Sequence, residues 1–326
     1  MKAAIIGAGF VADFHADSYQ QMDQVELVAI CDVDASKAED MAFKYKCTGY
    51  TIAEDMLVTE KPDLVSICVP TFLHETYVNM ALVHGAHVLC EKPLALTMEA
   101  CLRMAEAAES KRRILMTGQV LRWWPEYQQI SKEIGRMGRP SFLAAQRLQH
   151  AGRTSWLTDP RKGGGALFDL YVHDLDFICS LLGYSPRIEA VSGTAGVEGS
   201  WRNLCSLMRW PDGVCAKIES SNLQPVKYPF TAYFRADYHT ACLQYEFRAP
   251  VNIQRDAIAK TEFLLFESGE VQQLAVAQNA QVSAFSKEIE AFVHGVEQGE
   301  SPLPIENTLA VMNLVHRVKA MLEDMP

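Results

Sequence analysis

The sequence lacks a long uninterrupted hydrophobic segment, since no stretch reaches the roughly 18 apolar residues that a membrane-spanning helix requires. It also lacks an excess of positive charge, because 30 lysine and arginine residues stand against 40 aspartate and glutamate residues, for a formal charge of -10. A chain of this charge repels the phosphate backbone of nucleic acids at long range. We therefore expect neither a membrane span nor a nucleic-acid partner.

Closely spaced cysteines are also missing. The nine cysteines are spread along the chain with no two within five residues of each other, which excludes the CxxC spacing of common zinc sites. Their number is odd, and most lie in apolar runs such as residues 64–69, where a free thiol behaves as a small hydrophobic side chain. We expect free thiols in a reducing, cytoplasmic compartment and no metal site.

The residues that are present indicate about two domains, because 326 residues with 49% hydrophobic content can fill two cores. Short apolar runs alternate with helical patterns in the first 120 residues. The expected strands are 3–6, 25–31, 63–69, 86–90 and 114–117, and the expected helices are 11–22, 35–45, 74–84 and 97–110. This alternation predicts a Rossmann domain over residues 1–120, an α/β fold whose doubly wound parallel sheet is covered on both faces. We interpret the apolar start as its first strand rather than a secretory signal, because Gly7, Gly9 and Asp13 follow at once.

The pattern changes after about residue 120. The expected strands are now 141–149, 188–197, 203–210, 214–221, 231–235, 240–247 and 261–267, and the expected helices are 166–182, 284–297 and 306–323. Clustered strands between helices predict an α+β domain over residues 121–326 with a large, mostly antiparallel open sheet. Its C-terminal helices can pack back on the first domain.

The first glycine-rich turn, GAGFVA, has the GxGxxA spacing of a dinucleotide-binding turn between a strand and a helix. Its first glycine allows the tight turn, its second lets the backbone approach a pyrophosphate, and its small alanine lets the helix pack closely. The residues expected to bind the cofactor here are Gly7, Gly9, Phe10, Val11 and Ala12. Asp32 ends the second expected strand, 20 residues after Ala12, where a carboxylate binds the ribose hydroxyls of NAD and repels a 2′-phosphate. Because no arginine follows Asp32, the pattern favours NAD over NADP.

Two further segments carry candidate chemistry. Lys92 directly follows a strand of the expected parallel sheet, and ligands bind beyond the carboxyl ends of such strands. Asp169 and His173 are four residues apart after the glycines 163–165, which puts them on one face of a helix. An aspartate beside a histidine can orient the imidazole and raise its basicity. The alternatives left open are a surface lysine before a helix and a histidine with ordinary structural contacts.

Together these motifs resemble the glucose-fructose oxidoreductase, inositol dehydrogenase and rhizopine catabolism family of NAD(P)-dependent sugar and cyclitol oxidoreductases. The resemblance rests on motifs up to about residue 185 and on strand pattern and length after that. Residues 69–74 resemble the segment that passes the nicotinamide, which implies cofactor contacts for Pro70, Thr71 and His74, although many members have asparagine where Thr71 stands. The sequence Glu91-Lys92-Pro93 matches the family's most specific signature and adds Glu91 and Lys92 to the cofactor site.

The resemblance also extends to the substrate side. Arg122-Trp123-Trp124-Pro125 resembles the family's Arg-Phe-x-Pro segment, and Asp169 and His173 fit its DxGxH pattern. Tyr171 replaces the usual glycine of that pattern, and we expect it to narrow the helix face beside the site.

The resemblance implies that Lys92, Asp169 and His173 form the catalytic group. Oxidation of a secondary alcohol needs a hydride acceptor, which NAD supplies, and a proton acceptor. His173 is the preferred base, with Asp169 orienting it or binding a neighbouring hydroxyl, while Lys92 stabilises the developing alkoxide and is the alternative base. Arg122 can contact the substrate, and Trp156 can stack on a sugar face, although a packed tryptophan beside solvated charges is an alternative.

Three functions are compatible with these motifs. The leading one is an NAD-dependent dehydrogenase of a secondary hydroxyl on a sugar, a sugar derivative or a cyclitol. The others are an NAD-retaining glycosidase that acts by transient oxidation and elimination, and a non-catalytic NAD-binding regulator. An open antiparallel sheet with an apolar face invites a partner, and the resemblance implies a homodimer or homotetramer formed through the sheet of the second domain.

Overall fold

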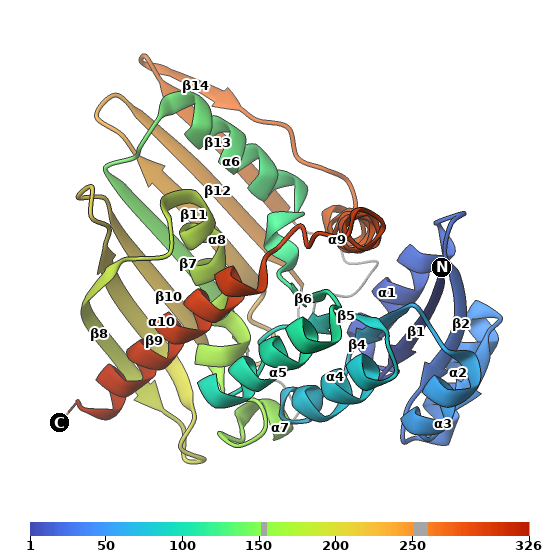
Figure 1. Cartoon of the computed structure of the whole chain (residues 1–326). Helices are drawn as coiled ribbons and strands as arrows, with labels where there is room; N and C mark the ends of the chain where they lie inside the picture. The colour runs from blue at the N-terminus through green and yellow to red at the C-terminus, as the bar shows by residue number, and fades with distance from the viewer. Residues whose placement is uncertain (151–154, 251–259, 326) are drawn as a thin grey trace. The chain divides into compact units, whose positions relative to one another are not determined.

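The computed structural model describes residues 1–150, 155–250 and 260–325. Its contacts divide the chain into two compact units, one of Met1–Trp123 with Gln281–Leu309 and one of Trp124–Ala280 with Ala310–Pro326 (Figure 1). The division near residue 123 leaves one C-terminal helix with the first unit and most of another with the second. Each unit has its own sheet and its own buried core.

The sheet of the first unit has six parallel strands in the order β3-β2-β1-β4-β5-β6. These strands are β1 (Lys2–Ile6), β2 (Glu26–Cys31), β3 (Thr48–Tyr50), β4 (Leu64–Ile67), β5 (His87–Glu91) and β6 (Leu115–Gly118). The connecting helices are α1 (Phe10–Gln20), α2 (Ala35–Tyr45), α3 (Ala53–Glu60), α4 (His74–Val83) and α5 (Met98–Lys111). The predicted doubly wound Rossmann sheet is thereby confirmed, and its strand order reverses between β1 and β4, where ligands of such sheets bind.

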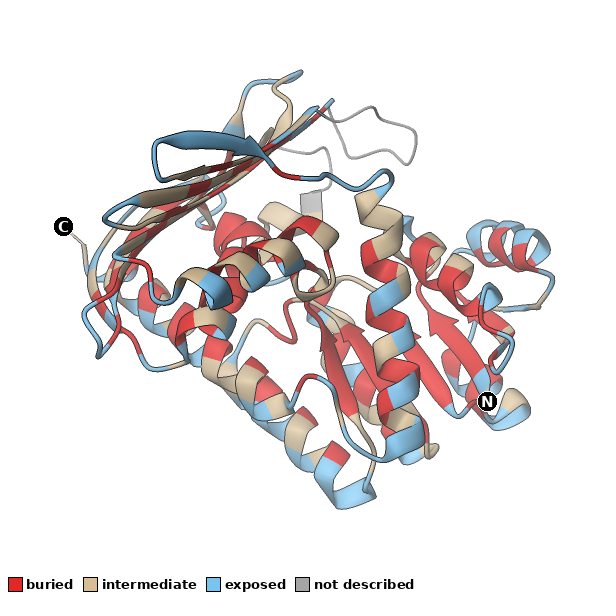
Figure 2. Ribbon diagram, turned by 90° about the horizontal axis from the view of Figure 1, so that it is seen from above, coloured by how far each residue is buried: buried red, intermediate tan, exposed pale blue. Residues whose placement is uncertain are grey.

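Apart from β3, the strands of this sheet are mostly buried, as the red ribbons in Figure 2 show. Local signals fix the helix ends: the Thr97 side chain accepts a hydrogen bond from the Ala100 amide at 3.2 Å, which caps α5. The sequence analysis missed β3 and α3. With only three residues and two of them exposed, β3 at the sheet edge has no apolar run to signal it.

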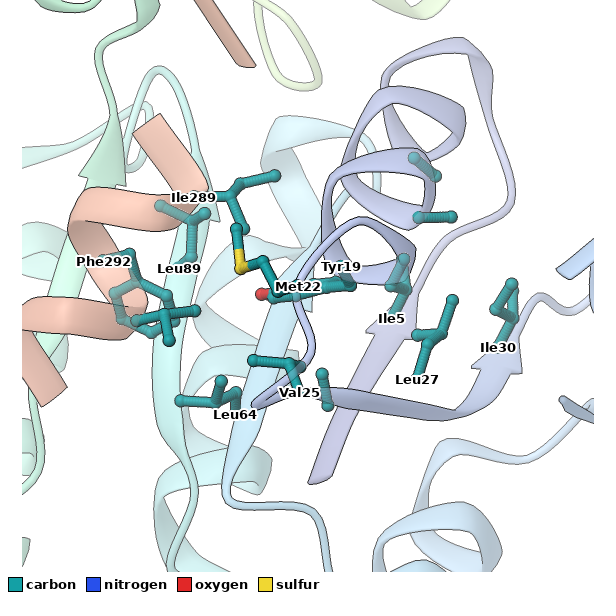
Figure 3. Close-up of a cluster of buried hydrophobic side chains, with 14 of the residues drawn as sticks. Ile5, Tyr19, Met22, Val25, Leu27, Ile30, Leu64, Leu89, Ile289 and Phe292 are labelled. Atoms are coloured by element: carbon teal, nitrogen blue, oxygen red, sulfur yellow. The ribbon is translucent and has the colours of Figure 1, made fainter. Parts of the chain in front are cut away.

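Helix α9 (Ala280–Gln298) packs into the core of the first unit although it lies far along the chain. Its Ile289, Phe292 and Val293 are fully buried in a cluster with Tyr19 and Leu89 (Figure 3). Phe285 of the same helix stacks on Phe14 of α1, with 4.8 Å between ring centroids. The hydrophobic core of the Rossmann unit is therefore completed by a helix from the C-terminal part of the chain.

The sheet of the second unit has eight strands in the order β14-β13-β12-β11-β7-β10-β9-β8. They are β7 (Phe142–His150), β8 (Arg187–Ala195), β9 (Trp201–Arg209), β10 (Cys215–Gln224), β11 (Phe230–Asp237), β12 (Ala241–Ala249), β13 (Lys260–Glu267) and β14 (Glu270–Gln273). Every neighbouring pair is antiparallel except β7 and β10, which run parallel. The prediction of a large, mostly antiparallel sheet in an α+β arrangement is confirmed.

The second unit also contains helices α6 (Pro125–Met137) and α8 (Val172–Leu182) and most of α10 (Ile305–Glu323). Tyr127 of α6 makes edge-on ring contacts with Phe177 of α8, Phe234 of β11 and Tyr245 of β12, so α6 and α8 pack on one face. The sequence analysis missed α6, although Pro125 at its first turn is a helix-start signal. Side chains along β9 alternate between buried and half-buried, as in a sheet with one face on the core.

The described residues 1–150, 155–250 and 260–325 contain neither a membrane-spanning helix nor a metal-binding cluster. In these ranges, no helix is long and apolar enough to cross a bilayer. No group of three or more histidine, cysteine, aspartate or glutamate side chains in the same ranges is arranged to hold a metal ion. All nine cysteines are free thiols.

Candidate active site

The turn between β1 and α1 contains the first glycine, Gly7, in a conformation that other residues rarely adopt. Its φ is +100°, its amide donates to the Cys31 carbonyl at 2.7 Å, and a Cβ there would collide with the Cys68 carbonyl. Both neighbours lie at strand ends, so the turn is pressed between β2 and β4. A side chain at residue 7 would push these two strand ends apart.

The start of α1 leaves room for an anion. Gly9 is the N-cap residue of this 11-residue helix, no side chain caps the helix there, and a Cβ at Gly9 would meet no atom within 4 Å. Ala12 is fully buried against the sheet, whereas Phe10 is 55% exposed and packs edge-on against Phe14. An open, uncapped helix N-terminus favours negative charge, which fits the pyrophosphate of a dinucleotide.

Asp32 lies directly beside this turn. One carboxylate oxygen accepts a hydrogen bond from the Ala8 amide at 2.8 Å, and the other accepts from the Asp34 amide at 2.9 Å. A carboxylate oxygen can accept more than one hydrogen bond, so both oxygens keep capacity for the two hydroxyls of a ribose. The adjacent Val33 is 83% exposed. The residues of the turn and Asp32 together fit the pyrophosphate and ribose of NAD(P).

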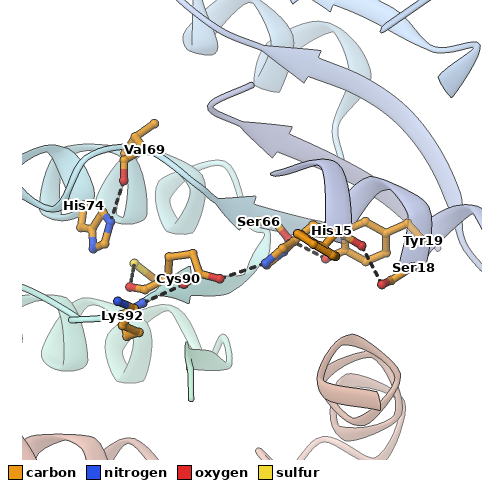
Figure 4. Close-up of polar contacts among 10 residues, drawn as sticks. His15, Ser18, Tyr19, Ser66, Val69, His74, Cys90 and Lys92 are labelled. Atoms are coloured by element: carbon orange, nitrogen blue, oxygen red, sulfur yellow. Dashed lines mark hydrogen bonds and ion pairs between the residues drawn. The ribbon is translucent and has the colours of Figure 1, made fainter. Parts of the chain in front are cut away.

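The segment after β4 turns through a short 3₁₀ helix, Thr71–Leu73, which Pro70 precedes. Pro70 is half-buried and Thr71 is buried at 5% exposure. His74 begins α4 and is buried at 1% exposure, with backbone carbonyls facing both of its ring nitrogens. Figure 4 shows the contact with the Val69 carbonyl. The imidazole of His74 therefore contacts the protein backbone.

Lys92 follows the last residue of β5, at the carboxyl end of the strand that pairs with β4. The Lys92–Pro93 peptide bond is cis. The Lys92 amide donates to a carboxylate oxygen of Glu91 at 3.3 Å, and the other oxygen of Glu91 contacts His15 of α1 at 3.1 Å (Figure 4). Glu91 is thus connected to the helix that begins at the glycine turn.

Asp169 and His173 lie in the second unit, on a helix whose first part is otherwise buried. Between Ala166 and Cys179 these two residues are half-buried, and all the others are buried. The helix begins as a π-helical stretch, Leu167–Tyr171, and continues as α8. π-helical turns are frequent at functional sites. The two side chains expected to face a substrate therefore share the one accessible stripe of this helix.

Strand β7 anchors the same helix through two residues that point to one face of the strand. Gln149 donates from its side-chain amide to Asp169 at 3.1 Å. Arg147 makes two hydrogen bonds to the Asp174 carboxylate, at 2.8 and 3.1 Å, and both side chains are almost fully buried. The sequence analysis missed Gln149 and Arg147, although a buried arginine in an apolar strand pattern is a signal that could have found one of them.

Tyr171 does not narrow the face of Asp169 and His173, so that expectation is wrong. Its side chain is fully buried, and its hydroxyl lies 2.6 Å from the Ser206 hydroxyl of β9. Burial raises the pKa of Tyr171. A tyrosine in place of glycine is accommodated here because it extends the contact between the helix and the sheet.

The remaining expected substrate contacts lie in two short helices. Arg122 ends the 3₁₀ helix Val120–Arg122 of the first unit and is half-buried. Trp156 is half-buried in the short helix α7 (Ser155–Thr158) of the second unit. A Cβ on Gly163 would collide with the backbone of Trp156 and Leu157, so the glycine-rich stretch packs directly against α7.

The predicted residues thus form two groups. In the first unit, all predicted cofactor residues lie at the carboxyl ends of the four neighbouring strands β2, β1, β4 and β5. Asp32 follows β2, the glycine turn follows β1, the segment 70–74 follows β4, and Glu91-Lys92 lies at the end of β5. In the second unit, Asp169 and His173 share one helix face. The sequence analysis missed His15 and Ser66, polar residues at buried positions of the first unit.

Comparison with known proteins shows which family the chain belongs to. A family model described as an oxidoreductase family with an NAD-binding Rossmann fold matches residues 1–119, and one described as the GFO/IDH/MocA C-terminal domain matches residues 131–243. The chain belongs to the GFO/IDH/MocA family. The resemblance inferred from the sequence motifs is confirmed, and the chain is an NAD(P)-dependent oxidoreductase of this family.

Other members of the GFO/IDH/MocA family match over nearly the whole chain. D-glucoside 3-dehydrogenase of Escherichia coli (strain K12) is 29% identical over 318 residues, which cover 91% of this chain and 88% of that protein. Inositol 2-dehydrogenase of Rhizobium meliloti (strain 1021) is 26% identical over 324 residues, covering 94% and 92%. The solved structure of KijD10, a 3-ketoreductase from Actinomadura kijaniata in complex with NADP and TDP-benzene, has a TM-score of 0.83 at 18% identity and covers 99% of this chain and 98% of its own.

Proposed function

We propose that this oxidoreductase is an NAD-dependent dehydrogenase acting on a secondary hydroxyl of a sugar, a sugar derivative or a cyclitol. The observation that carries the proposal is the accessible stripe of Asp169 and His173 on a helix whose first part is otherwise buried, in a chain with Lys92 at the end of β5. The names of two relatives, a glucoside 3-dehydrogenase and an inositol 2-dehydrogenase, support this substrate class.

Each residue has a separate task in the proposed reaction. Bound NAD supplies the hydride acceptor when the alcohol is oxidised. His173 removes the hydroxyl proton, and Asp169 orients the imidazole or binds a neighbouring hydroxyl. The ammonium of Lys92 stabilises the negative charge that develops on the oxygen, and Lys92 is the alternative base. Arg122 and Trp156 contact the rest of the substrate.

The cofactor contacts follow from the same groups. The turn residues Gly7, Gly9, Phe10, Val11 and Ala12 hold the pyrophosphate, and Asp32 holds the ribose. Pro70, Thr71, Glu91 and Lys92 line the nicotinamide side. His74 holds the backbone of these segments in place, because its buried ring contacts the carbonyls of Val69 and Pro93.

The preference for NAD over NADP rests on the charge around the end of β2. Asp32 and Asp34 are two residues apart, and Asp34 caps α2 by accepting from the Ser36 amide at 3.1 Å. Lys37 lies 3.8 Å from Asp34, so its charge is already offset. A 2′-phosphate would meet this acidic pair, and we expect NAD to bind more tightly than NADP in a fluorescence titration. Equal or tighter binding of NADP would contradict the assignment.

The function is tested by incubating the protein with NAD and a panel of polyols that includes glucosides, nucleotide-linked hexosamines and inositols. We expect NADH absorbance to appear with at least one polyol. Lys92→Ala and His173→Ala should each lower kcat by about 10²- to 10⁴-fold, the contribution typical of a proton-transfer or charge-stabilising group. Val83→Ala, at an exposed position of α4, is a control that should leave activity unchanged.

The two alternative functions give different outcomes in the same assay. Release of sugar from a nitrophenyl glycoside without net NADH would identify an NAD-retaining glycosidase. Tight cofactor binding with no turnover on any member of the panel would identify a regulator.

We also propose that the chain forms a homodimer or homotetramer in the cytoplasm through the half-buried face of the eight-stranded sheet. Side chains along β9 alternate between buried and half-buried, so the half-buried side chains of this face are available to contact a second copy of the chain. Aromatic and aliphatic residues there, such as Phe142 and Leu207, lie among exposed ion pairs such as Arg209 with Glu189. Light scattering of the purified protein should give a mass of two or four chains, and Leu207→Glu should reduce it.

The net charge of -10 argues against a nucleic-acid partner.

A further inference from the structure

Two fully buried histidines contact the chain on either side of Lys92 in the first unit. His15, on α1, contacts the side chain of Glu91, which precedes the lysine. His74, at the start of α4, contacts the carbonyls of Pro93 and Leu94, which follow it. The backbone of Lys92 is therefore bracketed by one buried imidazole on each side.

The contacts of His15 form a chain of hydrogen bonds whose direction follows from an ionised Glu91 and a neutral imidazole. An ionised carboxylate only accepts, so the His15 Nε2 proton is donated to Glu91 at 3.1 Å. In the neutral ring, His15 Nδ1 then accepts from the Ser66 hydroxyl at 2.9 Å. The Ser66 oxygen in turn accepts from the Tyr19 hydroxyl, also at 2.9 Å. Each of these buried groups is satisfied in this arrangement.

The same carboxylate is held from two more directions. Its second oxygen accepts from the Lys92 amide at 3.3 Å. A Cβ on Gly118 of the neighbouring strand β6 would lie only 3.2 Å from Glu91, so the glycine leaves the space that the carboxylate occupies. Glu91 thus has one well-defined position, and His15 is the group that ties it to α1.

His74 holds the other side of the lysine. Its Nδ1 lies 2.9 Å from the Pro93 carbonyl and 3.2 Å from the Leu94 carbonyl, while its Nε2 lies 3.0 Å from the Val69 carbonyl. Burial lowers the pKa of His74, which opposes protonation of both nitrogens. Since two carbonyls converge on Nδ1, we assign the single proton of the neutral ring to that nitrogen.

We propose that His15 and His74 are positioning residues that fix the backbone of Lys92 with respect to the cofactor turn. The inference rests on the proposed function only in giving Lys92 a role in the reaction. Because α1 begins at the glycine turn and also contains His15, one rigid helix sets both the pyrophosphate site and the position of Glu91. His74 fixes the distance between the segments that follow β4 and β5.

Matched amide substitutions separate positioning from mere packing. The amide nitrogen of glutamine reaches the place of histidine Nε2, and that of asparagine reaches the place of Nδ1. His15→Gln therefore keeps the donor to Glu91, whereas His15→Asn loses it. We expect His15→Asn to lower kcat by about 10- to 100-fold, as for a small misplacement of a reacting group, with KM changed by less than about threefold. His15→Gln should retain kcat within about threefold.

The expectation reverses for the second histidine. His74→Asn keeps the donor to Pro93 and Leu94 and should retain kcat within about threefold. His74→Gln places its amide nitrogen at the position of Nε2 beside Val69, leaves both carbonyls without a donor and should lose about tenfold or more. If glutamine and asparagine are equivalent at both positions, the histidines act through volume alone and the proposal is wrong. The melting temperature of each variant shows whether a lost activity reflects unfolding.

A readout that needs no turnover separates failure of this inference from failure of the proposed function. Lysines are reductively methylated with ¹³C-formaldehyde, and the methyl resonance of residue 92 is assigned by its loss in Lys92→Arg. We expect this resonance to shift or split in His15→Asn and His74→Gln and to match the wild type in His15→Gln and His74→Asn. An unchanged resonance in all four variants would overturn the positioning role, whether or not a substrate is found.

Discussion

The two units hold their candidate catalytic residues by different kinds of bond. In the first unit, the imidazoles of His15 and His74 contact the residues next to Lys92, and the hydroxyl of Ser66 contacts His15 in turn. In the second unit, a buried ion pair between Arg147 and Asp174 contacts the residue next to His173. In both units these bonds fall on a chain neighbour of the reactive residue, and in the second unit Gln149 also bonds directly to Asp169. A site built in this way fixes the backbone while leaving the chemistry to the adjacent side chain.

The difference lies in what each anchor loses when one partner is removed. Loss of a hydroxyl from the chain of Tyr19, Ser66 and His15 leaves polar atoms unpaired. A broken buried ion pair instead leaves an uncompensated charge in a medium of low dielectric constant. The second unit therefore depends on its anchor more strongly than the first. The following predictions test this ranking.

The largest effect is expected at the ion pair of the second unit. Asp174→Ala leaves the Arg147 guanidinium buried without its partner and should lower the free energy of unfolding by about 3–5 kcal/mol, measured by urea denaturation of the apo protein. As a control, Asp237→Ala breaks the more exposed pair with Arg235 and should cost no more than about 1 kcal/mol. If the two variants lose the same stability, the buried pair is not the stronger anchor.

A smaller effect is expected in the middle of the hydrogen-bond chain of the first unit. Ser66→Ala removes the partner of both His15 and Tyr19 and should cost about 1–3 kcal/mol for each polar group left unpaired. Adding Tyr19→Phe to Ser66→Ala removes one of these orphaned groups, so the double variant should be no less stable than the single one. A further additive loss in the same denaturation experiment would show that the three groups do not act as a chain.

The parts of both units that the sequence revealed are those fixed by local order. The positions of the glycine turn, Asp32 and Lys92 at strand ends were predicted correctly, because spacing from a strand end is local in the sequence. The chain of Tyr19, Ser66 and His15 was not found, because its members are 47 and 51 residues apart in sequence and meet only through the register of β4 beneath α1. The side-chain direction of Tyr171 was also not predicted, because it is set by contacts with a strand that is distant in sequence.

The helices and strands show the same limit. Helix α5 was predicted from its cap at Thr97, but α6 was missed although Pro125 starts it, since the neighbouring tryptophans were interpreted only as a motif. The helical pattern over residues 166–182 gave no indication of its π-helical beginning, Leu167–Tyr171. A π-turn depends on how a helix fits against its sheet, which hydrophobic periodicity does not encode.

The stability of the first unit should also depend on pH. His87 accepts a hydrogen bond from the Ile114 amide at 3.0 Å, and burial, helped by Arg113, lowers the pKa of His87. The unfolded chain then binds more protons than the folded one below about pH 6.5, so stability should fall as the pH drops through this range. His87→Asn keeps an acceptor near Ile114 and should reduce the pH dependence of the urea midpoint.

The control for this prediction is the exposed His294 of α9, which is 71% exposed at its side chain. His294→Asn should leave the pH dependence of the urea midpoint as it is in the wild type. An equal reduction in both variants would mean that the effect comes from general charge rather than from the buried acceptor.

The smallest effect on activity is expected at Tyr171, where the sequence suggested a change in substrate fit. Its hydroxyl faces Ser206 in the buried contact between helix and sheet, so Tyr171→Phe should cost about 1 kcal/mol of stability. Because this side chain points away from the stripe of Asp169 and His173, the relative kcat/KM values across the polyol panel should not change. A reordered panel would mean that Tyr171 reaches the substrate after all, and that the anchor of this helix and its specificity are not separate.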